Sequence, residues 1–281
     1  MKPLKLYLAG NHSHYHCGSS VVWNTIKKYL EFKNFELVGE LNNCDVLLMN
    51  GEGSMHHGKR GFMRKMKLIE EAQLLEKKTF LINTVWMKNP PTYDGVLKKI
   101  DQIVCRDLFS CVDLKNNHGM NSRLAPDLSC LSMSSEERYV FLDSLDKRND
   151  QLIFTDFYSP EFGGWVKYTA CKFKGFQTVD MSKLSWTSLL STIGRSRLVV
   201  TGRFHMVCAC LLTKTPFVAL KSNSHKIEGM AAACDASLPV ANYPGEIKPL
   251  VESALEGRYD RSYRNAFAWI DNFTLESVMP L

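Results

Sequence analysis

The sequence has 281 residues, of which 45% are hydrophobic and 23% charged, proportions that predict a globular chain with a sizeable core. Its formal charge of +6 fits anionic small molecules or peripheral contact with an anionic membrane surface, and is too weak to predict nucleic acid binding. No run approaches the roughly 18 apolar residues of a membrane span, and the chain begins like a strand rather than a signal peptide. Nine cysteines without a C-x-x-C pair favour a reducing cytoplasm.

The first part of the chain alternates strand-like and helix-like segments. Short apolar runs predict strands at 5–9, 35–39, 45–50 and 79–85. Longer amphipathic stretches predict helices at 19–32 and 60–78, and the basic start of the second is typical of a solvated face. This alternation predicts a parallel α/β sheet, in which ligands bind at the loops that follow the strands.

The loop after the first predicted strand contains alternating histidines. His12, His14 and His16 could ligate a metal ion together with His56 or His57. However, no acidic residue stands close by, and the H-x-H spacing is not diagnostic. We therefore expect no metal, and interpret the loop as polar or substrate-contacting.

The strand predicted at 45–50 leads into a turn that contains Gly51 and Gly53. Glycines there let a ligand approach the backbone, although they also suit a tight turn between strand and helix. Farther along, Arg106 follows another apolar run. This arginine either reaches a ligand cleft or ties the domain together through Asp127, and the sequence favours neither interpretation.

A polar and charged stretch at 132–150 predicts a linker, which divides the chain into domains at 1–140 and 150–281. The second domain is expected to contain strands at 152–157, near 178–180 and at 238–241, and helices at 186–193, 247–255 and 263–273.

Near the centre of the second domain, a buried-type strand at 198–200 ends at Gly202 and is followed by a helix. Arg203 and His205 then fall in the first helical turn, where free N–H groups and the helix dipole favour an anion. An arginine fork and an imidazole add anion recognition and a group that titrates near neutral pH. The alternative is a solvated arginine and a structural, half-buried histidine.

The segment from Gly202 through His205, the strand at 215–220 and the element Lys226 to Gly229 together resemble the C-terminal signature of the polysaccharide pyruvyl transferase family. The resemblance upstream is weaker. Of the family's N-x-G-D motif only Gly18 remains, and Ser19 stands at the acidic position.

Three further elements extend the resemblance. The family's G-G-G-S turn is similar to residues 51–54, with Glu52 in place of the middle glycine, and strand 103–107 and the segment 123–127 match two more motifs. The resemblance implies a GT-B-like fold, in which two Rossmann-like domains face each other across a cleft and the last helix crosses back to the first domain.

The implied reaction transfers a pyruvyl group from phosphoenolpyruvate to two hydroxyls of a sugar or lipid-linked sugar, with the donor as a substrate and no cofactor. His205 would act as acid and then base, and Arg203 would bind the anionic donor. The residues implied on the donor side are Gly202, Arg203, His225, Lys226 and Glu228. Those implied on the acceptor side are His16, Gly18, Gly51, Glu52, Gly53, Ser54 and Arg106.

Two other functions fit the same pattern. In a GT-B glycosyltransferase with a nucleotide-sugar donor, Glu228 would hold the ribose and the Gly202 turn the phosphates. A carbohydrate- or anion-binding module without catalysis is disfavoured, because arginine, histidine and lysine converge in the signature. An enzyme of either class would work in the cytoplasm, at times in contact with the inner face of the membrane.

Overall fold

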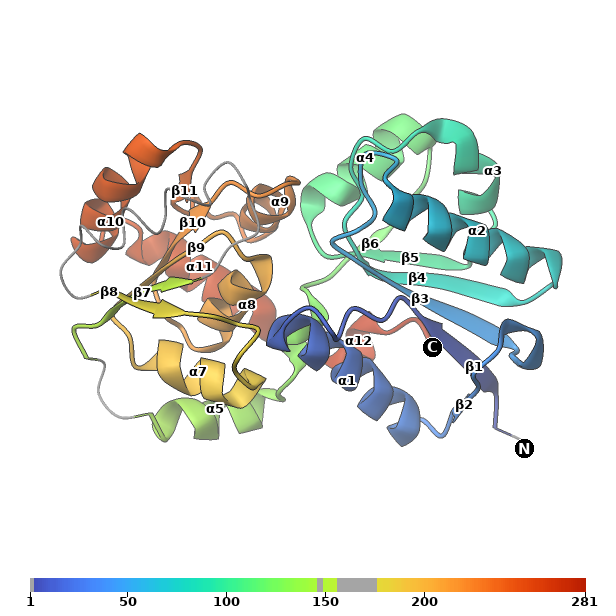
Figure 1. Cartoon of the computed structure of the whole chain (residues 1–281), viewed down its shortest axis with the longest axis horizontal. Coiled ribbons are helices and arrows are strands. Elements are labelled where there is room, and N and C mark those ends of the chain that lie inside the picture. The colour runs from blue at the N-terminus through green and yellow to red at the C-terminus, as the bar shows by residue number, and fades with distance from the viewer. Residues whose placement is uncertain (1–2, 146–148, 156–175) are drawn as a thin grey trace.

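The computed structural model in Figure 1 describes residues 3–145, 149–155 and 176–281. These residues form two parallel β-sheets, one in each half of the chain. The first sheet has the strand order β2-β1-β3-β4-β5-β6, with bounds β1 Lys5–Ala9, β2 Glu36–Leu37, β3 Val46–Glu52, β4 Lys78–Thr84, β5 Gln102–Cys105 and β6 Arg123–Leu124. The second has the order β11-β10-β9-β7-β8, with bounds β7 Leu152–Thr155, β8 Phe176–Val179, β9 Leu198–Thr201, β10 Phe217–Leu220 and β11 Val240–Ala241. The fold is therefore α/β with two Rossmann-like domains, as predicted.

Helices flank both sheets (Figure 1). The first part of the chain contributes α1 Cys17–Phe32, α2 Arg60–Leu74, α3 Asp94–Leu97, α4 Leu108–His118 and α5 Ser135–Asp143. The second contributes α7 Trp186–Gly194, α8 Phe204–Leu212, α9 Lys226–Ala233, α10 Ile247–Leu255, α11 Asp260–Asp271 and α12 Leu275–Val278. Side-chain caps fix several helix starts: His16 accepts a hydrogen bond from the backbone of Ser19, and Asp107 accepts one from Ser110.

The central strands explain the apolar runs in the sequence. Every residue of β3, β9 and β10 is buried, as expected for parallel strands covered on both faces. In the first sheet β1 lies between β2 and β3, and in the second β7 lies between β8 and β9. At such reversals of strand order the loops diverge, and this opens room for a ligand at the carboxyl ends of the strands.

Some element ends differ from the predicted ones. The strand predicted at 45–50 continues to Glu52, whereas the helix predicted at 60–78 ends at Leu74. The chain turns there through Glu76, whose φ of 56° lies in the left-handed region, and then enters β4. The strand predicted at 35–39 is reduced to Glu36–Leu37. Of the strand predicted at 152–157, the last two residues lie outside the described part of the chain.

The two domains contact each other through helices and through the end of the chain. Helix α1 meets α7 and α8, and α4 packs against α9. Helix α11 contains most of the helix predicted at 263–273, but it packs on the second domain through Tyr263 and Ile270 and does not itself cross back as expected. Residues after it return to the first domain, where Val278 and Met279 are buried in the core. Among the helices described, none is both long and apolar enough to cross a bilayer.

Candidate active site

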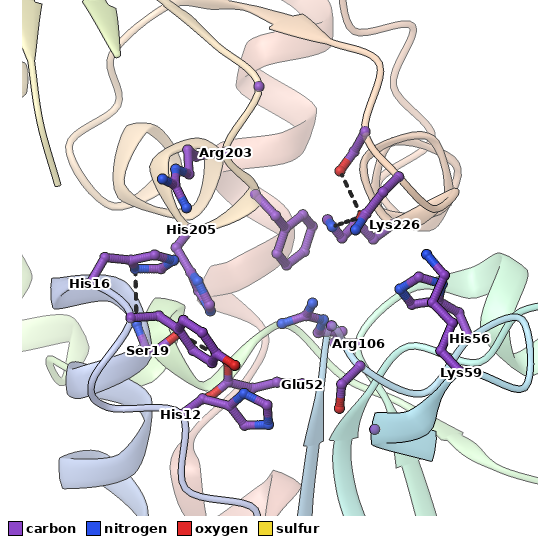
Figure 2. A pocket seen from close by; sticks show the side chains of 18 residues that line it. His12, His16, Ser19, Glu52, His56, Lys59, Arg106, Arg203, His205 and Lys226 are labelled. Carbon is purple, nitrogen blue, oxygen red and sulfur yellow. Dashed lines mark hydrogen bonds between the residues drawn. The ribbon is translucent and has the colours of Figure 1, made fainter. Parts of the chain in front are cut away.

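A cavity of about 350 Å³ lies between the two domains (Figure 2). Arg203, His205 and Lys226 enter it from the second domain, while Arg106 and Glu52 enter from the first. The lining residues are His12, Tyr15, His16, Ser19, Glu52, Gly53, Ser54, His56, Lys59, Gly61, Arg106, Gly202, Arg203, Phe204, His205, Ser222, Asn223 and Lys226. Most of the residues predicted for the site therefore meet in one cavity.

The turn after β9 positions Arg203 and His205. The backbone N–H of Arg203 donates to Thr201 Oγ1 over 3.0 Å, and Thr201 Oγ1 is in turn held by Thr155 Oγ1 at 2.6 Å. Arg203 is the N-cap residue of α8, so His205 falls in the first turn of the helix. His205 is only 6% exposed, and its Nε2 has no hydrogen-bond partner among the described residues.

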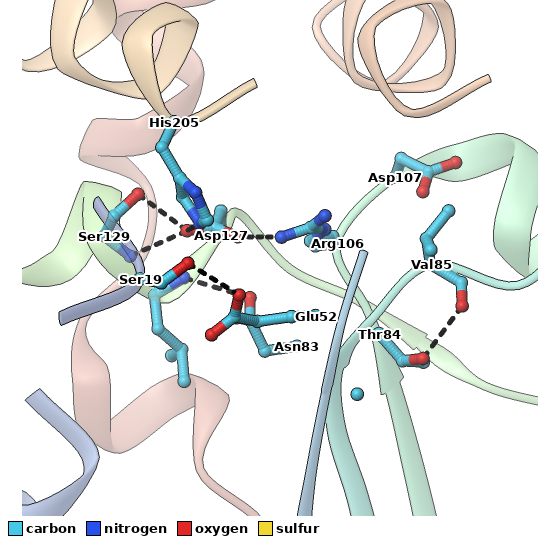
Figure 3. A network of polar contacts seen from close by, with 12 residues as sticks. Ser19, Glu52, Asn83, Thr84, Val85, Arg106, Asp107, Asp127, Ser129 and His205 are labelled. Atoms are coloured by element: carbon cyan, nitrogen blue, oxygen red, sulfur yellow. Dashed lines mark hydrogen bonds and ion pairs between the residues drawn. The ribbon is translucent and has the colours of Figure 1, made fainter. Parts of the chain in front are cut away.

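A buried carboxylate connects His205 to Arg106 (Figure 3). Asp127 Oδ1 lies 3.6 Å from His205 Nε2, and Asp127 Oδ2 accepts a 2.7 Å hydrogen bond from Arg106 Nη1. Ser129 donates to the same carboxylate through its backbone N–H and its hydroxyl. Burial alone would raise the pKa of Asp127, but the charges of His205 and Arg106 and the donated hydrogen bonds hold it well below its ordinary value. Asp127 therefore stays ionised and places a negative charge beside the His205 ring.

Arg106 satisfies both of the interpretations that the sequence left open. Its Nη1 pairs with Asp127, and the side chain also lines the cavity. The guanidinium lies 4.5 Å from the centre of the Phe204 ring, so a cation–π contact ties it to the second domain as well.

Lys226 begins α9 and lies on the second-domain side of the cavity. Its Nζ donates a 2.8 Å hydrogen bond to Asn223 Oδ1. Burial, followed by the nearby charge of Arg106, lowers the pKa of Lys226 to about 7. An anion in the cavity would favour the ammonium form again.

His225 and Glu228 were predicted beside Lys226 but do not line the cavity. His225 faces the other domain, with Nε2 3.2 Å from Ser110 Oγ and 3.5 Å from Asp107 Oδ1. A Cβ built on Gly229 would lie 2.4 Å from Asp107 Oδ1, so this glycine allows α9 to pack closely against the start of α4. Burial raises the pKa of Asp107 to about 6, although hydrogen bonds from Ser110 oppose the shift. This part of the signature therefore builds the contact between the domains.

The first-domain wall begins at the start of α1. The His16 and His205 rings meet edge to face, with centroids 5.1 Å apart. Burial, then the charges of His205 and Arg203, lower the pKa of His16 to about 3, which keeps the ring neutral. Gly18 is not a lining residue: a Cβ there would lie 2.4 Å from His205 Cβ. Its lack of a side chain lets α1 and α8 meet.

The end of β3 and the turn that follows it divide into a packing part and a lining part. A Cβ on Gly51 would lie 2.3 Å from Thr84 Oγ1, so this glycine serves the packing of β3 on β4. Glu52, Gly53 and Ser54 line the cavity instead. Gly53 lies close to Arg106, since a Cβ there would be 3.2 Å from Nη2.

The three alternating histidines take different positions. His12 lines the cavity and its Nε2 lies 2.9 Å from the buried Nζ of Lys65, while burial, then Lys65, lower the pKa of His12 to about 3. The ring of His14 lies against that of Tyr15 in a tilted arrangement, and His16 caps α1. Over residues 3–145, 149–155 and 176–281, no three metal-ligating side chains form a group that could hold an ion.

Sequence reasoning missed several lining residues, among them Lys59, Tyr15 and Asn223. The basic start of α2, interpreted as a solvated face, supplies Lys59 to the cavity and buries Lys65 against the backbone oxygens of Asn50 and Gly51. No sequence motif marked the two lysines, because a lysine near a helix start gives the same sequence pattern whether it faces solvent or a ligand.

Solved structures share this architecture. A UDP-GlcNAc 2-epimerase from Neisseria meningitidis bound to UDP-GlcNAc matches with a TM-score of 0.58 at 10% identity, over 97% of this chain and 97% of that one. A glycosyltransferase of kitacinnamycin matches with a TM-score of 0.56 at 9% identity, over 97% and 96%. An uncharacterised protein from Klebsiella pneumoniae matches with a TM-score of 0.57 at 13% identity, over 93% and 92%. At these identities the likeness concerns the fold, which is that of GT-B glycosyltransferases and related epimerases.

Two parallel-sheet domains with a polar cavity between them thus define a protein of the GT-B class. The sequence model of the family named polysaccharide pyruvyl transferase matches residues 5–224. The chain therefore belongs to the polysaccharide pyruvyl transferase family and is a transferase. A comparison with curated proteins gives no match.

Proposed function

We propose that the enzyme transfers the pyruvyl group of phosphoenolpyruvate to two hydroxyls of one sugar, in a cell-surface polysaccharide or its lipid-linked precursor. The observation that carries this proposal is the position of His205, which lies against the ionised Asp127 and lines the same cavity as Arg106, Arg203 and Lys226. Because phosphoenolpyruvate is made inside cells, the proposal places the enzyme in the cytoplasm, with a lipid-linked acceptor at the inner face of the membrane.

The cations suit the two charged groups of the donor. Phosphoenolpyruvate carries a phosphate and a carboxylate on the same carbon, and a guanidinium can bind either through two parallel hydrogen bonds. Arg203 is the N-cap residue of α8, where the helix dipole adds to its attraction for an anion. We assign donor binding to Gly202, Arg203 and Lys226, with Arg106 on the opposite wall; His225 and Glu228 are left out because they lie outside the lining.

His205 has the surroundings of a general acid. Ketal formation begins when a proton is added to the methylene carbon of the donor, which leaves a cation that a hydroxyl oxygen attacks. Asp127 stabilises the imidazolium that supplies this proton. The 3.6 Å separation is longer than a hydrogen bond, as is common for catalytic pairs before the substrate binds.

The acceptor is assigned to the first-domain wall. His16, Glu52, Gly53 and Ser54 line that side and offer neutral and acidic groups that can bind hydroxyls. Gly18 and Gly51 support this wall through packing rather than contact.

A donor test separates this proposal from nucleotide-sugar transfer. The purified enzyme is mixed with phosphoenolpyruvate, UDP-glucose or UDP-GlcNAc, and thermal unfolding is followed for each. A ligand at a hundred times its Kd stabilises a protein by about 2.7 kcal/mol. We expect stabilisation by phosphoenolpyruvate alone, and phosphate release with a new ketal methyl signal in proton NMR when a suitable diol is present. Selective stabilisation by a nucleotide sugar would contradict the proposal and favour the glycosyltransferase.

A further inference from the structure

Glu52 has a backbone conformation that glycine adopts more readily. Its φ is 43°, in the left-handed region, although it forms the last residue of β3 and its carbonyl accepts a 2.9 Å hydrogen bond from Val85. Non-glycine residues in this region cost free energy and concentrate at functional sites. The strained backbone therefore suggests that the side chain of Glu52 has a role of its own.

The carboxylate of Glu52 is buried and held from two sides. Oε2 accepts a 3.0 Å hydrogen bond from Ser19 Oγ, and Oε1 accepts a 3.1 Å bond from Asn50 Nδ2. Asn50 is oriented in turn, because its other contacts are to Gly10 O and to Asn83 Nδ2. Glu52 is 4% exposed and lines the cavity, so the remaining lone pairs of its carboxylate are available to a ligand there.

The partner of this carboxylate is informative. Ser19 stands at the acidic position of the family's N-x-G-D motif, and Glu52 stands at the middle glycine of the family's G-G-G-S turn. The two substituted positions are in direct contact through the hydrogen bond from Ser19 Oγ. A carboxylate missing from α1 is thus supplied at the same place by the last residue of β3. Figure 3 shows that it is distinct from Asp127, which pairs with Arg106 and His205.

We propose that Glu52 is the catalytic base that accepts the proton of the first hydroxyl of the acceptor sugar. The proposal rests on the proposed pyruvyl transfer. In the first step, His205 gives a proton to the methylene carbon, the first hydroxyl oxygen bonds to the central carbon, and the hydroxyl proton moves to Glu52.

In the second step, the other hydroxyl oxygen bonds to the same carbon as the bond to the phosphate oxygen breaks. Protonated Glu52 gives its proton to the leaving phosphate, and the second hydroxyl proton restores His205. At the end His205 is protonated and Glu52 is ionised, as at the start. The products are a ketal with a new methyl group and inorganic phosphate.

The test compares Glu52→Gln with Glu71→Gln, which removes an exposed carboxylate on α2 far from the lining set. Phosphoenolpyruvate binding is measured by calorimetry, and transfer is measured with methyl glycosides of galactose, glucose and mannose as probe acceptors. We expect Glu52→Gln to bind the donor as the wild type does, while kcat falls roughly 10²–10⁴-fold, the usual contribution of a general base. Glu71→Gln should match the wild type.

A relocation variant gives an independent readout. Glu52→Gly should be inactive, and Ser19→Asp combined with Glu52→Gly should recover part of the turnover, because the carboxylate returns from the other side. Wild-type turnover in Glu52→Gln would overturn the role of Glu52 and leave pyruvyl transfer intact. A wild-type enzyme that does not bind phosphoenolpyruvate would instead overturn the proposed function. Binding of the donor without transfer to any glycoside would count against the assignment of this wall to a sugar.

Discussion

Histidine and asparagine side chains have similar size and polarity, so His205→Asn tests the role of His205 in proton transfer. We expect the variant to bind phosphoenolpyruvate nearly as the wild type does, because Arg203, Arg106 and Lys226 remain. Turnover should fall roughly 10²–10⁴-fold, since the amide cannot supply the proton. Calorimetry and phosphate release measure the two effects separately. A variant with a lower melting temperature but wild-type turnover would mean that the histidine is structural.

Arg203→Lys keeps the charge at the start of α8 but removes the planar fork. Donor binding should weaken by about 1–3 kcal/mol, the range for a hydrogen bond to a charged group. Turnover at saturating donor should change less than the affinity. Equal affinity of the two proteins in calorimetry would show that Arg203 does not contact the donor.

Lys226 should make donor binding depend on pH. Its pKa in the empty cavity is about 7, so above pH 7 the donor must bind together with a proton. We expect Kd to rise with pH from 7 to 9, by at most about tenfold per pH unit. The phosphate of the donor, with a second pKa of about 6, is already largely ionised at pH 7 and cannot produce this rise. In Lys226→Met the affinity should be lower and this slope absent. A slope that persists in the variant would assign the titration to another group.

At the scale of single residues, the sequence predicted what one local turn determines. Arg203 and His205 share the turn after β9, and a glycine followed by a helix start already indicates their placement. Lys226 and Glu228 look equivalent in sequence. However, residues two positions apart on a helix are separated by about 200° around its axis, so the two side chains point to different sides. The contact of Asp127 with His205 was not predictable, because it depends on how the loop after β6 meets the second domain.

At the scale of elements, Gly18 tests the contact between α1 and α8. A methyl group there would lie 2.4 Å from His205 Cβ, so Gly18→Ala must push the helices apart. We expect a loss of about 1–3 kcal/mol in the free energy of unfolding, typical of overpacking, together with lower turnover from a displaced His205. Urea unfolding and phosphate release provide the measurements.

Gly95→Ala in α3 is the matched control. No atom lies within 4 Å of the Cβ that this change adds, so its effect on stability should stay below about 1 kcal/mol. If Gly18→Ala were equally harmless, the close approach of α1 and α8 would be wrong.

Element types were easier to predict than element ends. The apolar runs of β3, β9 and β10 determine buried strands whatever their neighbours are. The ends depend on tertiary contacts: β3 extends to Glu52 because that residue still pairs with Thr84 of β4. Strand β2 is short because only two of its residues pair with β1.

At the scale of the whole molecule, the end of the chain holds the two domains together. Met279 is 4% exposed in the core of the first domain, although it follows helices of the second. Met279→Ala should lower the free energy of unfolding by about 2–5 kcal/mol, as for other buried methionines. Glu276→Gln in the same segment breaks an exposed ion pair with Lys33 and should change the stability much less, because solvent screens exposed charges. Equal stability of the two variants in urea unfolding would show that the returning segment contributes little.

The contact between His205 and Asp127 also joins residues of two different domains. The second domain contributes Arg203, His205 and Lys226 to the cavity, but the carboxylate beside the imidazole comes from the first domain. On the proposed reaction, protonation of the donor therefore requires both halves in place, and the half that offers the carboxylate is also the half that offers the acceptor wall. An enol phosphate that is protonated before its diol arrives is lost to water. On the proposed reaction, dividing the acid and its counter-ion between two domains ties the first chemical step to the side of the cavity that binds the nucleophile.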